Sequence, residues 1–487
     1  MRILFSMRHS GALRNFASTL DALARDGHEV RLVFMTADKR GDGRLLRALQ
    51  AEHPAITVGE ITAGRRRGLW HEMARVVRTS GDYTRYWTRE YAGAHALRQR
   101  AAARVPPLVR AALNRRLIHS AAGLRLATRL CRLAEEAIPV DPEVAAVVAG
   151  AGPDLVLVTP LVDLGSPQVE YLKAARALGV RSGLAVHSWD NLTNKGVMRV
   201  VPDRVFVWND AQRLEAEAMH GVPSDRVVVT GAPAYDQWFD RAPSTTREAF
   251  CGAVGLRADR PILLYLCSSR FIAGDEPSFV ERWIAAVRAS PDAQVREAGL
   301  LVRPHPDNLP PWQTFDSSRH AELAVWPRDG GEPVDRASRD EYFDSMYHAA
   351  AAVGINTSAQ IEAGIVGLPV HTIRAPEFAG TQDGTLHFRH LLPEHGGLLH
   401  VADGLARHVE QIARSLDRGR EAGRVPEFVR SFVRPHGDDV AATERLAAAI
   451  VQLGSLPRPA PVRAGVTRLA ARAGLYALGV ATGNWHQ

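Results

Sequence analysis

Long apolar runs are absent from this chain of 487 residues, and cysteine is scarce. Nowhere do 18 apolar residues follow one another, so the sequence excludes an integral membrane protein, whose spanning helices need about 20. The three cysteines, Cys131, Cys251 and Cys267, lie far apart and form no Cys-x-x-Cys pair. This spacing argues against a disulfide framework or a zinc knuckle, and we expect three buried, unreactive thiols.

The N-terminus also lacks the marks of a leader. Residues Met1 to Met7 form too short an apolar stretch for a signal peptide, and no small-residue cleavage site follows. We therefore expect a cytoplasmic protein. The chain is too long for a single hydrophobic core, and 46% hydrophobic with 23% charged residues is typical of a globular protein, so we expect two domains of ordinary size.

Acidic residues are scarce between positions 61 and 130, which hold fifteen arginines but only three acids, with aromatic residues interleaved. A solvated helical face, a nucleic-acid site, an anionic membrane surface and an anionic-substrate site all fit this pattern. We favour the membrane surface, because the tail after Leu456 is also basic and acid-free and has an apolar stretch ending near Trp485. No nucleic acid is expected as a partner, since no zinc-finger, KH or RNP-like pattern is present.

Short apolar strands alternate with helical stretches, which predicts parallel α/β sheets covered on both faces. We predict a Rossmann-like domain over 1–235 with a basic helical insert at about 61–140, a second Rossmann-like domain over 245–440, and a helix with a basic tail over 441–487. The predicted strands are 2–5, 29–34, 154–158, 182–186, 204–207 and 226–229 in the first domain, and 261–266, 299–302, 322–326, 350–353 and 369–373 in the second. We expect the two domains to face a ligand cleft.

The segment 353–373 reads as strand, turn, helix and strand. Asn356, Thr357 and Ser358 stand where the helix begins, so backbone N–H groups and two hydroxyls would converge at its positive end, an arrangement suited to a pyrophosphate. Glu362 follows one turn after Ser358 on the same face, in reach of a ribose joined to that pyrophosphate. A plain helix-capping box fits the same letters.

A second polar loop follows the predicted strand 299–302. It reads Arg303-Pro-His305-Pro, and its prolines keep His305 out of any helix. Arg303, and Arg270 after Ser268 and Ser269 at another strand end, are candidates for binding phosphate oxygens, since a guanidinium can bind them in a bidentate manner. A surface ion pair is the alternative for both arginines.

These motifs resemble those of GT-B glycosyltransferases, near the UDP-N-acetylglucosamine 2-epimerase and CDP-glycerol glycerophosphotransferase branch, over most of residues 1–440. Asn356-Thr-Ser358, Glu362 and Gly367-Leu-Pro-Val370 are similar to the epimerase-like pattern of a small-residue turn, a ribose-binding Glu and Gly-x-Pro-Val. The resemblance implies that the turn holds the diphosphate and Glu362 the ribose. The loop at Arg303 resembles the glycerophosphotransferase loop whose His assists the transferred phosphate, which makes His305 a catalytic candidate.

The resemblance also bears on cofactors and on the reaction. GT-B enzymes neutralise the leaving diphosphate with helix ends and basic side chains, and this chain has no Asp-x-Asp motif, so no metal and no bound cofactor are expected. The chain reads Thr159-Pro-Leu-Val-Asp163 where the epimerases have Gly-Asp-Thr, and His187-Ser-Trp-Asp190-Asn191 replaces their acidic and glycine segment. These departures count against 2-epimerisation.

A general base for an acceptor hydroxyl should come from the first domain, where polar clusters follow two predicted strands. His9 or Asp190 could take the proton, because either residue type can be tuned to work near neutral pH. A structural role is the alternative for any single His in a chain that has 19. The further candidates for contacting the donor sugar or the acceptor are Arg8, Ser10, Gly11, His187 and Asn191, together with Gln382 and Asp383 in the second domain. For the last two, a plain Asp-Gly turn is the alternative.

The sequence thus predicts a cytoplasmic glycosyltransferase, peripheral on the inner face of the membrane, that acts in polysaccharide biosynthesis for the cell envelope. It would move a sugar from a nucleotide-diphosphate donor to a surface-glycan or lipid-linked acceptor. The alternatives are a CDP-glycerol-type polyol-phosphate transferase, a nucleotide-sugar 2-epimerase, and a non-catalytic nucleotide-binding scaffold.

Overall fold

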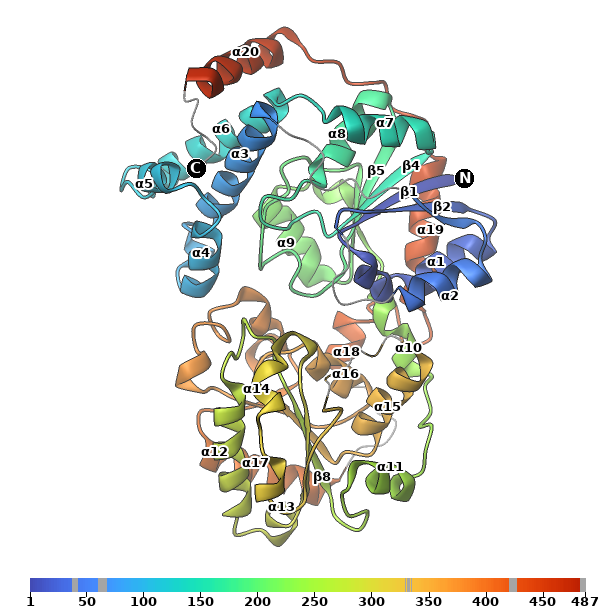
Figure 1. Cartoon of the computed structure of the whole chain (residues 1–487), viewed down its shortest axis with the longest axis vertical. Coiled ribbons are helices and arrows are strands. Elements are labelled where there is room, and N and C mark those ends of the chain that lie inside the picture. Colours follow the sequence, from blue (N-terminus) through green and yellow to red (C-terminus); the bar gives the residue numbers. More distant parts are fainter. Residues whose placement is uncertain are drawn as a thin grey trace. The chain divides into compact units, whose positions relative to one another are not determined.

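The computed structural model describes residues 1–36, 43–59, 68–328, 330, 333, 335–419 and 427–481. The arginines at 65–67 and Trp485, which contributed to the predicted membrane contact, lie outside the described residues. The chain forms two compact units (Figure 1). The first unit is Met1–Ala234 together with Arg434–Gln487, and the second is Tyr235–Val433.

The first unit is built on a parallel sheet of seven described strands, in the order β3-β2-β1-β4-β5-β6-β7. The sheet is covered on both faces because its residues alternate in direction: Ile3 and Phe5 pack in one core with Leu20, while Leu4 packs in the other with Leu172. The strands are β1 (Arg2–Met7), β2 (Glu29–Phe34), β3 (Ile56–Val58), β4 (Leu155–Thr159), β5 (Arg181–Ala185), β6 (Arg204–Val207) and β7 (Val227–Val229). The flanking helices are α1 (Ala17–Arg25), α2 (Arg44–Glu52), α7 (Pro142–Ala151), α8 (Val169–Leu178) and α9 (Asp210–His220).

The C-terminal part of the chain returns to this first unit. Helix α19 (Ala442–Ser455) lies beside α1 in Figure 1, and its Leu446, Ile450 and Leu453 belong to the core that also contains Ile3. Helix α20 (Val466–Ala481) packs on the insert: Arg472 Nε donates to the Ala137 carbonyl oxygen at 2.9 Å.

The insert between β3 and β4 is helical. It comprises α3 (Leu69–Arg85), α4 (His95–Ala102), α5 (Pro107–Leu113) and α6 (Ala121–Ala137). Helices α3 and α6 lie against each other and are joined to α8 by a buried charge network, in which Arg78 donates to Glu135 at 2.8 Å and also pairs with Glu170. Lys173 Nζ reaches Glu135 at 3.1 Å.

The second unit repeats the plan with a parallel sheet of six described strands, in the order β10-β9-β8-β11-β12-β13. Its strands are β8 (Ile262–Leu266), β9 (Gly299–Arg303), β10 (Leu323–Val325), β11 (Ala351–Gly354), β12 (Val370–Ile373) and β13 (Leu399–Ala402). Its helices are α10 (Asp236–Phe239), α11 (Arg247–Val254), α12 (Glu276–Arg288), α13 (Ala293–Arg296), α14 (Pro310–Gln313), α15 (Arg336–Tyr347), α16 (Ala359–Ile365), α17 (Leu405–Arg418) and α18 (Glu427–Phe432).

The predicted class, two Rossmann-like parallel sheets, is confirmed. Every predicted strand is present to within a residue or two, and the strand, turn, helix and strand at 353–373 become β11, α16 and β12. The sequence analysis missed β3 and β13, each of which lies at one edge of its sheet. Both are short and partly exposed, so their apolar signal is weak.

Candidate functional site

The candidate site of the second unit lies where the strand order reverses. The chain runs outward from β8 through β9 to β10, then returns to the other side of β8 with β11, and ligands of such sheets bind at this switch point, beyond the carboxyl ends of the strands. Ser268 follows β8 and Asn356 follows β11. The Asn356 backbone N–H donates to the Ser268 hydroxyl at 3.3 Å, so a hydrogen bond joins the two strand ends.

Loops after four strands meet at this point. Asn308, after β9, donates to the Ala273 carbonyl oxygen at 2.9 Å, and Thr381, after β12, donates to the Ile272 carbonyl oxygen at 2.6 Å. Asn356 Nδ2 donates to Thr385 Oγ1 at 3.0 Å. These bonds fix the loops that carry most of the predicted site residues of this unit.

A buried carboxyl supports the loop after β8. Both oxygens of Glu276 accept the Ser268 backbone N–H, at 2.8 and 3.0 Å, and the Tyr265 hydroxyl donates to one of them at 3.3 Å. Burial raises the pKa of Glu276 to about 8. Sequence reasoning missed Glu276, because nothing in the spacing marks a glutamate at the first position of a helix as buried.

The start of α16 is capped from within. The Thr357 N–H donates to Gln360 Oε1 at 3.1 Å, and Gln360 Nε2 donates to the Gly354 carbonyl oxygen at 3.0 Å. The Gln360 half of the capping box is therefore present, and the Thr357 amide is occupied. Ser358 is the exposed residue of the turn, and Asn356 and Thr357 are buried.

Glu362 lies one turn beyond Ser358 and is half-buried. The Tyr342 hydroxyl on α15 donates to Glu362 Oε2 at 2.6 Å. Burial and the Glu362 carboxylate raise the pKa of Tyr342 well above its ordinary value, so the phenol stays a neutral donor. One carboxylate oxygen is thus fixed by Tyr342, which sequence reasoning did not find because α15 lies in a different part of the chain.

The two candidate arginines differ in their surroundings. Arg303 is buried, and its Nη1 donates to Glu341 Oε1 at 2.6 Å and to Ser345 Oγ at 2.5 Å. It also lies over the Tyr342 ring. Arg270 is exposed, beside half-buried Ser269, and no hydrogen bond or ion pair joins it to the described part of the chain. Arg270 is therefore the guanidinium available to an anion.

The remaining candidates of the second unit occupy different positions. His305 is half-exposed, and its Nδ1 accepts the Asp307 N–H at 3.0 Å, which leaves the proton of a neutral ring on Nε2. Gln382 is fully buried, and its Nε2 donates to Ile355, Thr372 and Ile373 oxygens at 2.8 to 3.1 Å. It ties β11 to β12. Asp383 is exposed, 3.5 Å from Arg374.

The first unit has a polar cluster at its own switch point, between β1 and β4. Arg8, after β1, pairs with Asp163, after β4, at 2.9 Å, and Lys195 pairs with the other Asp163 oxygen at 2.9 Å. Burial opposes the charge, but Lys195 and Arg8 lower the pKa of Asp163 below its usual value. Sequence reasoning did not select Asp163 or Lys195, since their meeting depends on strand order.

His187 and Asp190 follow β5. His187 Nδ1 lies 3.2 Å from Asn191 Oδ1, and because an amide oxygen only accepts, Nε2 is the basic nitrogen. Burial and Lys195 lower the pKa of His187 to about 4. The two Asp190 oxygens accept from Ser188 Oγ at 2.6 Å and from Asn194 Nδ2 at 2.8 Å.

His9, Ser10 and Gly11 follow Arg8 at the start of a short 3₁₀ helix, Ser10–Asn15. All three are half-buried, and the His9 carbonyl oxygen accepts the Ala12 N–H at 3.0 Å.

One group of side chains has metal-ligand types and spacing among the residues that the structure describes. It consists of Asp21 on α1 with Glu52 and His53 at the end of α2. His53 Nε2 lies 2.7 Å from Asp21 Oδ1, so the pair already satisfies itself. The group lies in helices and not in the loops that follow the strands.

Two solved structures share the architecture of this chain. UDP-GlcNAc 2-epimerase from Methanocaldococcus jannaschii matches with a TM-score of 0.51 at 12% identity, over 93% of this chain and 100% of that one. MnaA from S. aureus, solved with UDP, matches with a TM-score of 0.50 at 15% identity, over 95% of this chain and 100% of that one.

This chain has the GT-B fold. The predicted resemblance is confirmed at the level of the fold. No protein-family model matches the sequence, and no curated protein matches it. Within the described residues of this GT-B chain, no helix has the length and apolar character needed to cross a membrane.

Proposed function

We propose that this protein is a glycosyltransferase that moves a sugar from a nucleotide-diphosphate donor to a surface-glycan or lipid-linked acceptor. The observation that carries the proposal is the network of strand-end loops at the β8/β11 switch point, with exposed Ser358 one helical turn from Glu362. The GT-B neighbours, a UDP-GlcNAc 2-epimerase and a protein solved with UDP, support a nucleotide-linked sugar as the donor class.

The donor would be bound by few groups. Arg270 and the Ser269 and Ser358 hydroxyls contact the diphosphate, and the Glu362 carboxylate binds the ribose diol. The guanidinium and hydroxyl groups stabilise the charge that develops on the leaving diphosphate, so the proposed transfer needs no metal.

The general base is proposed among the first-unit residues. His187 has a free basic nitrogen at Nε2, whereas both Asp190 oxygens already accept hydrogen bonds. Because the pKa of His187 is lowered to about 4, His187 is a weak base near neutral pH, and His9 and Asp190 remain the proposed bases. His305 is proposed to contact the transferred group through Nε2–H.

A thermal-shift screen tests the donor site. The purified protein is heated with UDP, GDP, CDP, CMP, ADP or dTDP, with and without EDTA, because a ligand selective for the native state raises its melting temperature. We expect one diphosphate to raise the melting temperature whether or not EDTA is present. No shift with any nucleotide would contradict the donor site, and a shift abolished by EDTA would contradict metal-independent binding.

A 2-epimerase is the second candidate, because the M. jannaschii neighbour carries that name. The glycosyltransferase and epimerase activities are distinguished by incubating the enzyme with the donor that the screen selects, without an acceptor. Conversion of the donor under these conditions would identify an epimerase. A polyol-phosphate transferase would instead bind CDP selectively.

We also propose that α6 docks the protein to an anionic membrane. Leu126, Leu130 and Leu133, spaced along one face, are each more than half exposed, and exposed Arg125, Arg129 and Arg132 alternate with them. Apolar side chains flanked by arginines are typical of helices that lie in the membrane interface.

Vesicle sedimentation checks this docking. We expect the protein to sediment with anionic vesicles at low salt and less at high salt, because salt screens the arginines. The double variant Leu126→Gln/Leu130→Gln should lose binding, whereas Leu214→Gln, at an equally exposed leucine on α9, should keep it. Equal binding to neutral and anionic vesicles would contradict the proposal.

A further inference from the structure

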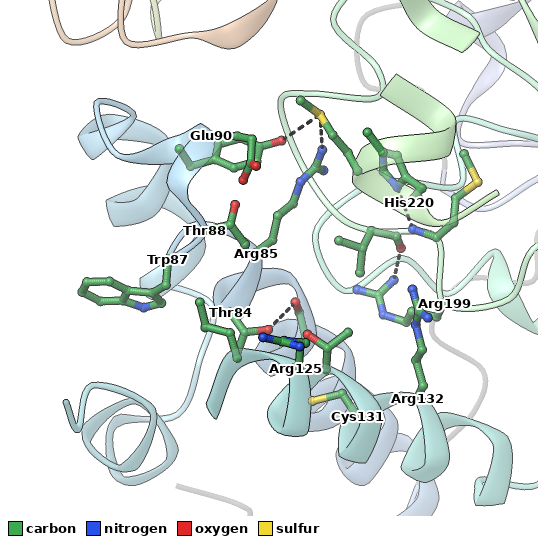
Figure 2. A pocket seen from close by; sticks show the side chains of 18 of the residues that line it. Thr84, Arg85, Trp87, Thr88, Glu90, Arg125, Cys131, Arg132, Arg199 and His220 are labelled. Atoms are coloured by element: carbon green, nitrogen blue, oxygen red, sulfur yellow. Dashed lines mark hydrogen bonds between the residues drawn. The ribbon is translucent and has the colours of Figure 1, made fainter. Parts of the chain in front are cut away.

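The first unit contains a cavity of about 680 Å³ that lies outside both switch points (Figure 2). Its walls come from α3, from α6, from the residues that follow α3, and from two stretches of the first unit, 197–199 and 218–220. Val77, Leu124 and Met219 make much of the wall apolar, and Trp87 contributes its indole.

Three guanidinium groups gather at one end of this cavity. Arg85, Arg132 and Arg199 all line it. Burial and the positive charges of these three arginines lower the pKa of His220 to about 3. Arg199 pairs with Asp82, but no ion pair joins Arg85 or Arg132 to a carboxylate of the described residues. This end of the cavity therefore carries an excess of positive charge.

The polar groups left without partners in the cavity wall are donors. Arg85 Nε, Arg199 Nε and Trp87 Nε1 are buried and make no hydrogen bond. The Arg85 side chain is fixed nonetheless, because its two terminal nitrogens donate to the Gly196 carbonyl oxygen at 2.5 Å and to the Leu192 carbonyl oxygen. Buried donors without acceptors cost free energy, and a ligand that supplies acceptor atoms would remove that cost.

His220 also lines this end of the cavity. It accepts the Met198 N–H on Nδ1 at 3.0 Å and donates from Nε2 to the Leu192 carbonyl oxygen at 2.7 Å, so the ring is neutral and adds no charge. The lining acid, Glu90, is exposed, and in Figure 2 it lies away from Arg132 and Arg199.

We infer that this cavity binds an amphiphilic phosphate: a phosphate group held by Arg85, Arg132 and Arg199, with an apolar chain along Val77, Leu124 and Trp87. Arginine is suited to this head group because its fork of N–H donors matches two phosphate oxygens. The volume fits a small-molecule ligand, since typical ligand pockets range from about 300 to 1,000 Å³. The inference does not depend on nucleotide binding by the second unit.

The cavity also lies against a loop that carries part of the polar cluster of the first unit. Two lining residues donate to the loop 192–199: Arg85 to the Leu192 and Gly196 carbonyl oxygens, and the Tyr91 hydroxyl to the Thr193 carbonyl oxygen at 2.8 Å. Asn194 of this loop donates to Asp190. A ligand in the cavity would therefore lie against the loop 192–199 that carries Lys195, the ion-pair partner of Asp163.

Calorimetry with decyl phosphate, kept below its micelle concentration, tests the inference. Inorganic phosphate and neutral decyl maltoside serve as the two partial ligands. We expect decyl phosphate to bind at least about tenfold more tightly than either, because only it uses both the guanidinium groups and the apolar wall. Inorganic phosphate binding as tightly as decyl phosphate would overturn the apolar part, and no binding of decyl phosphate would overturn the inference.

Two variants test whether decyl phosphate binds in the cavity. Arg132→Gln should weaken decyl phosphate roughly tenfold, the effect of one charge-assisted hydrogen bond, and Thr128→Trp should block the cavity from an exposed position on α6. Arg104→Gln is the control, because it removes an exposed arginine of the insert that neither lines the cavity nor belongs to the proposed docking face of α6, and its affinity should stay within about twofold of wild type. Unchanged affinity in both Arg132→Gln and Thr128→Trp would place the ligand elsewhere and overturn the inference. A nucleotide shift that persists in these variants would show that the donor site stands independently.

Discussion

At the scale of single residues, Glu362 combines a structural contact with the proposed ribose contact, and the two can be separated. Glu362→Gln keeps an oxygen for the Tyr342 hydroxyl but removes the negative charge. We expect its affinity for the selected nucleotide to fall roughly tenfold or more, since hydrogen bonds to charged groups are worth about 1.5–3 kcal/mol. The melting temperature without nucleotide should change little.

Tyr342→Phe is the matched control for Glu362. It removes the hydroxyl that donates to Glu362 and leaves the carboxylate in place. We expect nucleotide affinity to stay near that of wild type, as measured by the same titration. Equal losses in Glu362→Gln and Tyr342→Phe would mean that the pair only supports the fold, and would remove the ribose assignment.

Glu276 makes a pH-dependent contribution to stability. Its pKa of about 8 in the folded chain lies above the ordinary value of 4.5, so between these values the folded state binds more protons than the unfolded state. The free energy of unfolding should therefore fall as the pH rises through this window. Chemical denaturation at about pH 5 and about pH 8 should show wild type losing stability relative to Glu276→Gln. Parallel pH profiles for the two proteins would contradict the raised pKa.

At the scale of elements, the buried network on α3, α6 and α8 holds the helical insert to the first sheet. Arg78→Met would leave Glu135 and Glu170 buried without their guanidinium partner, and we expect a loss of about 3–5 kcal/mol in the free energy of unfolding. Arg75→Gln, at the exposed pair with Glu72 one turn earlier, should cost less than about 1 kcal/mol. Denaturant titration measures both, and similar losses would show that α3 is not anchored through Arg78.

The helices of the insert also divide the arginines of the basic segment into a buried group and an exposed group. Arg78 and Arg85 point inward and bond to carboxylates or carbonyl oxygens, whereas Arg125 and Arg129 are exposed on α6. A solvated or membrane-facing surface is thus formed by only part of the segment. Composition alone could not divide them, because burial depends on which helix face meets the sheet.

At the scale of the whole molecule, the first unit needs the end of the chain. A chain truncated after Val433 loses α19 and its buried Leu446, Ile450 and Leu453, and each buried leucine or isoleucine contributes about 2–5 kcal/mol. We expect the first unit to unfold in this truncated chain, as seen by calorimetry and limited proteolysis. Truncation after Ser455 keeps α19 and removes the largely exposed α20, so its effect should be smaller. Identical melting of both truncated chains and wild type would contradict the role of α19.

The strands other than β3 and β13, the two-sheet class and the segment from β11 to β12 could be predicted because they depend on local patterns of apolar and turn residues. The position of Ser358 and Glu362 on one helix face follows from helical spacing alone. Other site features could not be predicted. Arg303 and Arg270 look alike in the sequence. In the structure Arg303 pairs with Glu341, whereas Arg270 is exposed.

By itself, the sequence determined the parallel α/β architecture, the polar residues at strand ends and the basic character of the insert, since these follow from residue order and short-range geometry. Only the tertiary structure decided which strand ends and which helices become neighbours. That choice joined Ser268 to Asn356, Arg8 to Asp163, and Tyr342 to Glu362, and it enclosed the arginine-lined cavity of the first unit. The physical reason is that strand order and helix packing bring together residues far apart in the chain, and the burial and charge that govern their chemistry arise from those contacts.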